Sequence, residues 1–244
     1  MDSKITAGER NGVEVKAVLL DAAGTLMRPS KPVGEAYAMV ARRYGAELEP
    51  NKLLHAFGEA FGQMPDLAFR WGSMEELERL ERDWWRTLVH RVIVRVGVNV
   101  SDFAGFFEAL YEHYARGSAW ECFTEVPTVL EALRARGCQL AVVSNFDSRL
   151  PGILQALGVY DRMDAVVYSS EAGHAKPDPA IFRRALDELG VAPERTIHVG
   201  DNAKADVVGA VSAGLTGLLI QRDRSLSIAS VPTIRSLDEL IVRV

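Results

Sequence analysis

The stretch VKAVLLDAAGTL, residues 15–26, joins a short apolar run to an acidic residue and a glycine-containing turn. A nearly continuous run of aliphatic residues is typical of a strand that is buried on both faces of a parallel sheet. Ligands of such sheets bind beyond the carboxyl ends of the strands. The stretch therefore predicts a buried strand that delivers Asp21 to a binding site.

Further along the chain, similar apolar runs alternate with segments of helical periodicity. Each helical segment is followed directly by a glycine, which is the common residue just past a helix end. The predicted strands are Gln139–Val143, Asp164–Tyr168, Thr196–Val199 and Thr216–Ile220, and the predicted helices are Val126–Arg136, Ser148–Leu157, Pro179–Leu189 and Ala203–Ala213. Strands and helices that alternate with short connections predict an α/β fold with a doubly wound parallel sheet.

A long helical segment interrupts this alternation after the first strand. It holds no strand-like run, and Ser73 with Glu76 forms the pattern of a capping box. The predicted helices are Gly34–Tyr44, Asn51–Phe61, Met74–Val96 and Asp102–Arg116. We therefore expect a core domain of residues 13–30 and 121–244, an all-helical cap domain of residues 31–120, and a disordered tail of residues 1–12.

The composition narrows the class of partner. The chain has 244 residues, of which 48% are hydrophobic and 25% charged, and its net charge is −5. Nucleic acid or an anionic membrane surface would require a basic face, so we expect neither as a partner. Two cysteines are too few for a disulfide framework, and the N-terminus resembles no signal peptide, so a soluble cytoplasmic protein is expected. The oligomeric state is left open.

The predicted strand ends bring chemically active side chains to one edge of the sheet. Asp21, Ser144 and Asp201 each end a strand or follow one, and Lys176 lies in a nearby loop. Carboxylates, a hydroxyl and an ammonium together are what phosphoryl transfer requires: a nucleophile, a metal site and a cation for the phosphoryl oxygens. His198, inside an apolar strand, is expected to be a core histidine with a hydrogen-bond partner.

Four segments resemble the motifs of the haloacid dehalogenase superfamily. DAAGTL at 21–26 resembles its first motif, DxDGTL, and Ser144-Asn145 resembles the second. Lys176 in KPDP resembles the third, and GD at 200–201 with Asp206 resembles the fourth, GDxxxxD. The helical insert resembles the cap of subfamily IA. The sequence around the second and third motifs, SNFDSRLPGIL and EAGHAKPDPAIF, is most similar to the branch containing haloacid dehalogenase-like hydrolase domain-containing protein 3 and the rhythmically expressed insect proteins.

The resemblance implies a Mg²⁺-dependent phosphatase that acts on a small phosphorylated metabolite. Asp21 is expected to form an aspartyl-phosphate, and Lys176 to neutralise the nucleophile and the phosphate together. Ser144 is expected to donate a hydrogen bond to a phosphoryl oxygen, with Asn145 and Thr25 as substrate-binding residues. The implied Mg²⁺ ligands are Asp21, the backbone carbonyl of Ala23, Asp201 and Asp206, the last as a direct ligand or as a support for the site.

The chain departs from the family pattern at Ala23. Phosphatases of the superfamily carry a second Asp there, which protonates the leaving group and later activates water. General acid–base catalysis typically accelerates a reaction about 10²–10⁴-fold, so the absence of this Asp should lower the rate. A cap residue, a good leaving group such as that of an acyl phosphate, or slow turnover would each account for it. His55, His113 and His174 are the candidate substitutes.

Three other functions remain open at this point. Phosphonoacetaldehyde hydrolases also carry Ala at this position and use a cap lysine, for which Lys52 is the candidate here. A 2-haloacid dehalogenase needs no metal, but its fourth motif lacks the pair Asp201 and Asp206. A weakened site that only binds its ligand is the third, and the intact set of motif residues argues against it.

Overall fold

The structure is a computed structural model that describes residues 14–223 and 231–244. The expected tail, residues 1–12, lies outside the described residues. A six-stranded sheet with the order β5-β4-β1-β6-β7-β8 forms the core, and all its neighbouring pairs are parallel. Its strands are β1 (Ala17–Leu20), β4 (Gln139–Ser144), β5 (Ala165–Tyr168), β6 (Thr196–Gly200), β7 (Thr216–Ile220) and β8 (Thr233–Ile234).

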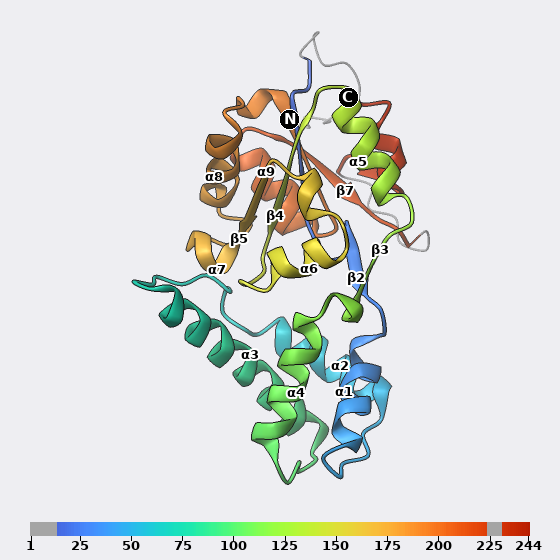
Figure 1. Cartoon of the computed structure of the whole chain (residues 1–244), viewed down its shortest axis with the longest axis vertical. Helices are drawn as coiled ribbons and strands as arrows, with labels where there is room; N and C mark the ends of the chain where they lie inside the picture. The colour runs from blue at the N-terminus through green and yellow to red at the C-terminus, as the bar shows by residue number, and fades with distance from the viewer. Residues whose placement is uncertain (1–13, 224–230) are drawn as a thin grey trace, which may run out of the picture.

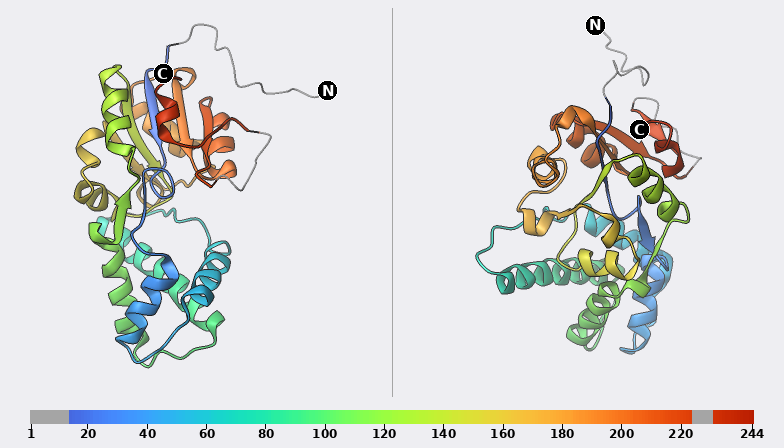
Figure 2. Two further views of the ribbon diagram at one scale, coloured as in Figure 1. Left: turned by 90° about the vertical axis from the view of Figure 1, so that its right-hand side faces the viewer. Right: turned by 45° about the horizontal axis from the view of Figure 1, so that its top comes forward.

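Helices cover both faces of this sheet (Figure 2). Alternate residues of β1 point to opposite faces, as the pleat of a strand requires. Val18 and Leu20 belong to the apolar cluster formed with α5 (Val126–Ala135) and α6 (Leu150–Ala156). Ala17 and Leu19 belong to the cluster formed with α8 (Pro179–Leu189) and α9 (Gly209–Ser212). The predicted doubly wound α/β fold is confirmed.

Four helices form a second body beyond the carboxyl ends of the strands (Figure 1). They share an apolar cluster of their own, rich in aromatic residues. They are α1 (Val33–Arg42), α2 (Pro50–Phe61), α3 (Met74–Val96) and α4 (Phe103–Ala115). The Ser73 hydroxyl accepts from Glu76 N at 3.2 Å, as the capping box predicts, and α3 ends at Gly97 with φ 74°.

A short antiparallel ribbon that the sequence did not indicate joins the two bodies. Its strands are β2 (Met27–Pro29) and β3 (Trp120–Cys122). Each has only three residues, too few to show an alternating pattern. α7 (Ser169–Ala172) was also missed, and short 3-10 turns span Gly117–Ala119, Tyr160–Arg162, Pro193–Arg195 and Leu237–Leu240. None of the described helices is both long and apolar enough to cross a membrane.

Candidate active site

Asp21 stands at the carboxyl end of β1. Its backbone N–H donates to Val199 O at 2.9 Å, so the pairing with β6 continues up to this residue. The following loop turns back tightly, because Leu26 N and Met27 N both donate to Ala22 O. Gly24 has φ +85°, and a Cβ there would lie 2.1 Å from Asp201 Oδ2. Only glycine allows this loop to approach Asp201 so closely.

Lys176 bridges two of the carboxylates. Its Nζ lies 2.7 Å from Asp21 Oδ1 and 2.6 Å from Asp206 Oδ1, and all three side chains are buried. Asn145 holds the Lys176 backbone from both sides: Asn145 Nδ2 donates to Lys176 O at 2.9 Å, and Lys176 N donates to Asn145 Oδ1 at 2.7 Å. Asn145, expected to bind substrate, thus acts in this structure as a positioning residue for Lys176.

Asp206 is held by further contacts from the core. His198 Nε2 lies 3.0 Å from its Oδ1, and Asn202 N donates to its Oδ2 at 2.9 Å. Asp206 lies in a π-helical turn, Ala203–Val208, where a single helix Ala203–Ala213 was predicted. Such turns are frequent at functional sites. A Cβ on Gly200 would lie 2.0 Å from Asp206 Cγ, so the missing side chain at Gly200 permits this close contact.

Asp21, Asp201 and Asp206 offer carboxylate oxygens that all lie within 4.8 Å of one another. One lysine cannot neutralise three carboxylates. Desolvation together with the charges of Asp21 and Asp206 raises the pKa of Asp201 to about 7, although part of its surface stays exposed. Burial also raises the pKa of Asp21, against the opposing charge of Lys176. A hard divalent cation would relieve this repulsion, and carboxylates are its usual ligands, so these residues fit Mg²⁺.

The pKa of Asp206 moves the other way. Burial by itself would raise it, but Lys176 and His198 outweigh that effect and hold the pKa well below its ordinary value. Burial in turn lowers the pKa of His198, although its bond to Asp206 opposes this. Asp206 therefore stays ionised and keeps Lys176 charged. His198 has the expected partner on Nε2, while Nδ1 has none among the described residues.

Ser144 and Thr25, the two hydroxyl residues expected to contact the substrate, lie in different surroundings. Ser144 is buried at the carboxyl end of β4, and its hydrogen bond lowers the pKa of Asp21 slightly against the effect of burial. Thr25 is fully buried, and its Oγ1 has no hydrogen-bond partner among the described residues. Thr25 also does not line the cavity described next. Its expected contact with substrate stays a prediction that this geometry does not favour.

A cavity of about 520 Å³ opens between the sheet domain and the four helices. Ala23, Asn145 and Asn202 line its core side, so it reaches the loop that carries Asp21. Its other walls are mostly aromatic. The ten aromatic residues are Tyr37, Phe57, Phe61, Trp84, Trp85, Phe107, Tyr111, Tyr114, Trp120 and Phe146.

A buried polar contact joins α3 to the core beside this cavity. Glu81 accepts from Ser148 N at 3.0 Å and from the hydroxyls of Ser148 and Ser170 at 2.5 Å each. Trp85 Nε1 donates to Asp147 Oδ2 at 2.5 Å. The sequence did not predict this contact. Helical spacing places Glu81 on the buried face of α3 with Leu77 and Trp84, but no local pattern shows which core residues lie against it.

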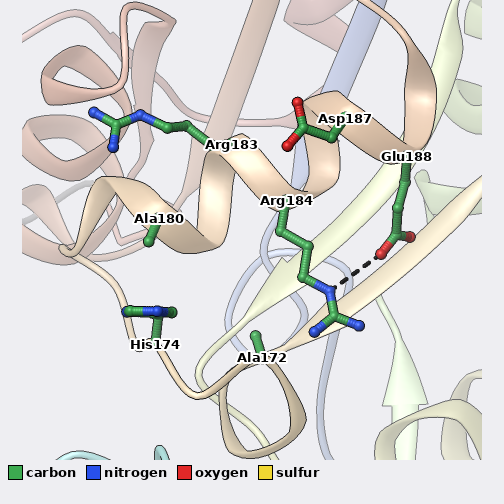
Figure 3. A pocket seen from close by; sticks show the side chains of 7 residues that line it. All are labelled: Ala172, His174, Ala180, Arg183, Arg184, Asp187 and Glu188. Carbon is green, nitrogen blue, oxygen red and sulfur yellow. Dashed lines mark hydrogen bonds and ion pairs between the residues drawn. The ribbon is translucent and has the colours of Figure 1, made fainter.

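None of the three candidate histidines lines the cavity among the described residues. His55 is exposed beside Glu59, and His113 packs its ring against Tyr114. His174 lies in a separate surface hollow beside α8, with Ala180 and Arg184 (Figure 3), and its Nδ1 is 2.8 Å from Asp178 Oδ2. Lys52 is likewise exposed and pairs with Glu49 at 3.0 Å. The geometry supports none of these as a catalytic group.

Comparison with known proteins defines the class. A family model described as haloacid dehalogenase-like hydrolase matches residues 15–214, so the chain belongs to the haloacid dehalogenase-like hydrolases. Within that family it is similar to haloacid dehalogenase-like hydrolase domain-containing protein 3 of Homo sapiens, with 34% identity over 88% of this chain and 85% of the relative. Rhythmically expressed gene 2 protein of Drosophila melanogaster is 27% identical over 84% of this chain and 82% of its own length.

Solved structures share this architecture. A HAD phosphatase from Thermococcus onnurineus has a TM-score of 0.64 and 25% identity, covering 93% of this chain and 96% of its own. L-2-haloacid dehalogenase from Xanthobacter autotrophicus has a TM-score of 0.65 and 19% identity, covering 94% and 98%. The second likeness concerns the fold alone. This chain is thus a hydrolase whose fold is shared by phosphatases and dehalogenases.

Proposed function

We propose that this hydrolase is a Mg²⁺-dependent phosphatase that acts on a small phosphorylated metabolite and forms an aspartyl-phosphate on Asp21. The observation that carries the proposal is the cluster of Asp21, Asp201 and Asp206, in which Asp21 and Asp206 are buried against Lys176 and Asp201 is exposed beside them. A dehalogenase needs no metal, whereas this cluster holds more negative charge than Lys176 neutralises. That excess is what a divalent cation would compensate.

Each residue of the cluster has a distinct part in the proposed reaction. Asp21, the backbone carbonyl of Ala23 and Asp201 would hold Mg²⁺, which when bound supplies positive charge against the phosphoryl oxygens. Lys176 orients Asp21 and adds a second positive charge at the same point. Ser144 donates a hydrogen bond to a phosphoryl oxygen. Asp206, fixed by His198 and Asn202, keeps Lys176 charged and in place.

Alanine at position 23 restricts which leaving groups the substrate can have. Alanine has no proton to give, and none of the three candidate histidines lines the cavity among the described residues. The leaving group must therefore depart without a strong general acid from this loop. Hydrolysis of the aspartyl-phosphate then relies on the electrostatics of the cluster, without a base at this position.

Phosphate release from acyl, sugar and nucleotide phosphates tests the proposal, with Mg²⁺ and with chelator. Asp21→Asn is the blank, because the amide removes the nucleophile while its size is kept. Asp178→Asn is the matched control: Asp178 accepts from Ala180 N at the start of α8, and Asn makes the same cap. We expect release that requires both Mg²⁺ and Asp21 and is unchanged in Asp178→Asn.

Two parallel assays separate the competing chemistries. Halide release from a 2-haloacid without Mg²⁺, combined with no phosphate release, would replace the proposal with dehalogenation. A covalent adduct trapped by borohydride with phosphonoacetaldehyde would replace it with Schiff-base chemistry. Loss of that adduct in Lys52→Met would then identify the lysine.

A further inference from the structure

We propose that the leaving group of the substrate is an uncharged aromatic ring bonded to the phosphoryl group through a phenol-type oxygen. The inference rests on the proposed phosphatase function and names the class of its substrate. Two independent features lead to it: the character of the cavity wall, and the absence of an acid at position 23. The substrate is thus an aryl phosphate monoester.

The cavity wall is mostly aromatic and apolar, which suits contact with an aromatic ring. Beside its ten aromatic residues, seven more are aliphatic, alanine or proline, Gly62 and Met64 are also non-polar, and only Asp66, Asn145, Arg149 and Asn202 carry strongly polar side chains. Phe57 stacks on Phe61 with the ring centroids 5.6 Å apart, and Trp84 packs edge-on against Trp85 with the centroids 5.0 Å apart. Rings in these arrangements offer faces and edges to a further aromatic group. The volume of about 520 Å³ fits a small organic ligand.

The charges at the wall exclude a second anionic group on the substrate. Arg149 is the only cation among the described residues that line the cavity, and Asp147 already binds it, with Nε at 2.9 Å and Nη2 at 2.6 Å. The Arg149 guanidinium also lies over the rings of Trp85 and Tyr111. Asp66 adds a negative charge at the wall. The part of the substrate that enters the cavity therefore carries no negative charge.

The chemistry at position 23 favours the same substrate. A phenol has a pKa of about 10, whereas an alcohol resembles water at about 16. In the transfer step, a carboxylate oxygen of Asp21 bonds to phosphorus while the bond from phosphorus to the aryl oxygen breaks. The aryl oxygen leaves with the bonding electron pair as phenoxide and takes a proton from solvent.

Hydrolysis of the aspartyl-phosphate completes the balance. Water bonds to phosphorus, the bond from phosphorus to Asp21 breaks, and the proton that water loses replaces the one taken by phenoxide. One aryl phosphate and one water give one phenol and one inorganic phosphate. A phenol-type leaving group makes the first step feasible without the second Asp of the first motif.

A comparison of phenyl phosphate, acetyl phosphate and glucose 6-phosphate with Mg²⁺ tests the inference. Acetate is the better leaving group but has no ring, so it separates ring recognition from leaving-group reactivity. We expect kcat/KM to be highest for phenyl phosphate. A higher value for acetyl phosphate or glucose 6-phosphate overturns the inference and leaves the phosphatase intact. No release from any of the three that depends on Asp21 overturns the phosphatase, and the inference with it.

A pair of cap variants gives a second readout. Phe61 lines the cavity, Leu54 lies on the same helix outside it, and each is 47% exposed, so neither truncation should prevent folding. We expect Phe61→Ala to raise KM for phenyl phosphate about fivefold, the scale of one lost aromatic contact, with KM for acetyl phosphate unchanged. Leu54→Ala should change neither value. An equal rise for both substrates in Phe61→Ala, or no rise, would overturn ring recognition at this wall.

Discussion

Alanine at position 23 lies in the cavity wall two residues after the nucleophile. We predict that Ala23→Asp raises turnover of alkyl phosphates, by up to about 10²-fold, because the new carboxyl can protonate an alkoxide that otherwise leaves poorly. Aryl phosphates should gain less. The measurement is kcat for both substrate types, and Ala23→Asn, which has the same size but no acid, is the control. An unchanged or lower rate would count against the missing-acid account.

Gly24 determines how closely the nucleophile loop approaches Asp201. Gly24→Ala is predicted to destabilise the fold by more than the ~1–2 kcal/mol of a left-handed non-glycine residue, because its Cβ would also clash with Asp201. It should also weaken Mg²⁺ binding. Gly45→Ala is the control, since Gly45 has φ +72° and nothing within 4 Å of the added Cβ. Urea unfolding and Mg²⁺ titration measure both effects, and equal losses in the two variants would refute the clash.

The raised pKa of Asp201 predicts a pH dependence of metal binding. Its pKa is about 7 without metal, and a protonated carboxyl does not bind Mg²⁺. Affinity should therefore weaken as pH falls from 8 to 6, and binding near pH 7 should release protons. Calorimetric titration in buffers of different ionisation enthalpy measures the release. Asp201→Asn should bind weakly at every pH, and a variant that kept the same pH dependence would show that another group is responsible.

At the scale of elements, Glu81 joins α3 to the core. Desolvation raises the pKa of Glu81, although its bonds to Ser148 and Ser170 oppose this. A carboxyl whose pKa is higher in the folded than in the unfolded protein stabilises the fold most at pH values below its unfolded-state pKa of about 4.5. This stabilisation is lost as the pH rises through the pKa of the folded state. The wild type should therefore gain free energy of unfolding relative to Glu81→Gln as pH falls toward 4.5.

Denaturant unfolding of both proteins across this pH range measures the difference. Glu78→Gln, which changes an exposed carboxylate on the same helix, is the matched control and should show no such trend. A wild type that instead gained stability over Glu81→Gln with rising pH would mean that Glu81 is ionised and well compensated at this contact.

At the scale of the whole molecule, the cavity exists only where the two bodies meet. Three of the four tryptophans, Trp84, Trp85 and Trp120, line it. A ligand that enters should therefore change the tryptophan fluorescence. We expect a saturable change when phenyl phosphate is added to Asp21→Asn with Mg²⁺, and a smaller one with glucose 6-phosphate. The change should be reduced in Trp85→Phe, and no change with either ligand would place binding outside this cavity.

Local patterns predicted most of the elements. The helices Met74–Val96 and Pro179–Leu189 and the strand Thr216–Ile220 lie where they were predicted, because periodicity, caps and glycine stops act within a few residues. The sheet edge that gathers Asp21, Ser144 and Asp201 followed from the rule that parallel strands present their carboxyl ends together. The family resemblance followed from the same residues.

Tertiary structure alone decided what surrounds that edge. The bond from Trp85 to Asp147 spans 62 positions and the bond from Ser170 to Glu81 spans 89, so no local pattern encodes them. The same is true of the pairing of β2 with β3, the burial of Thr25 and the aromatic cavity assembled from all four cap helices. These features depend on contacts between segments that lie far apart in the sequence. The sequence by itself determined the chemical groups of the site, and the packing of cap on core determined what those groups can reach.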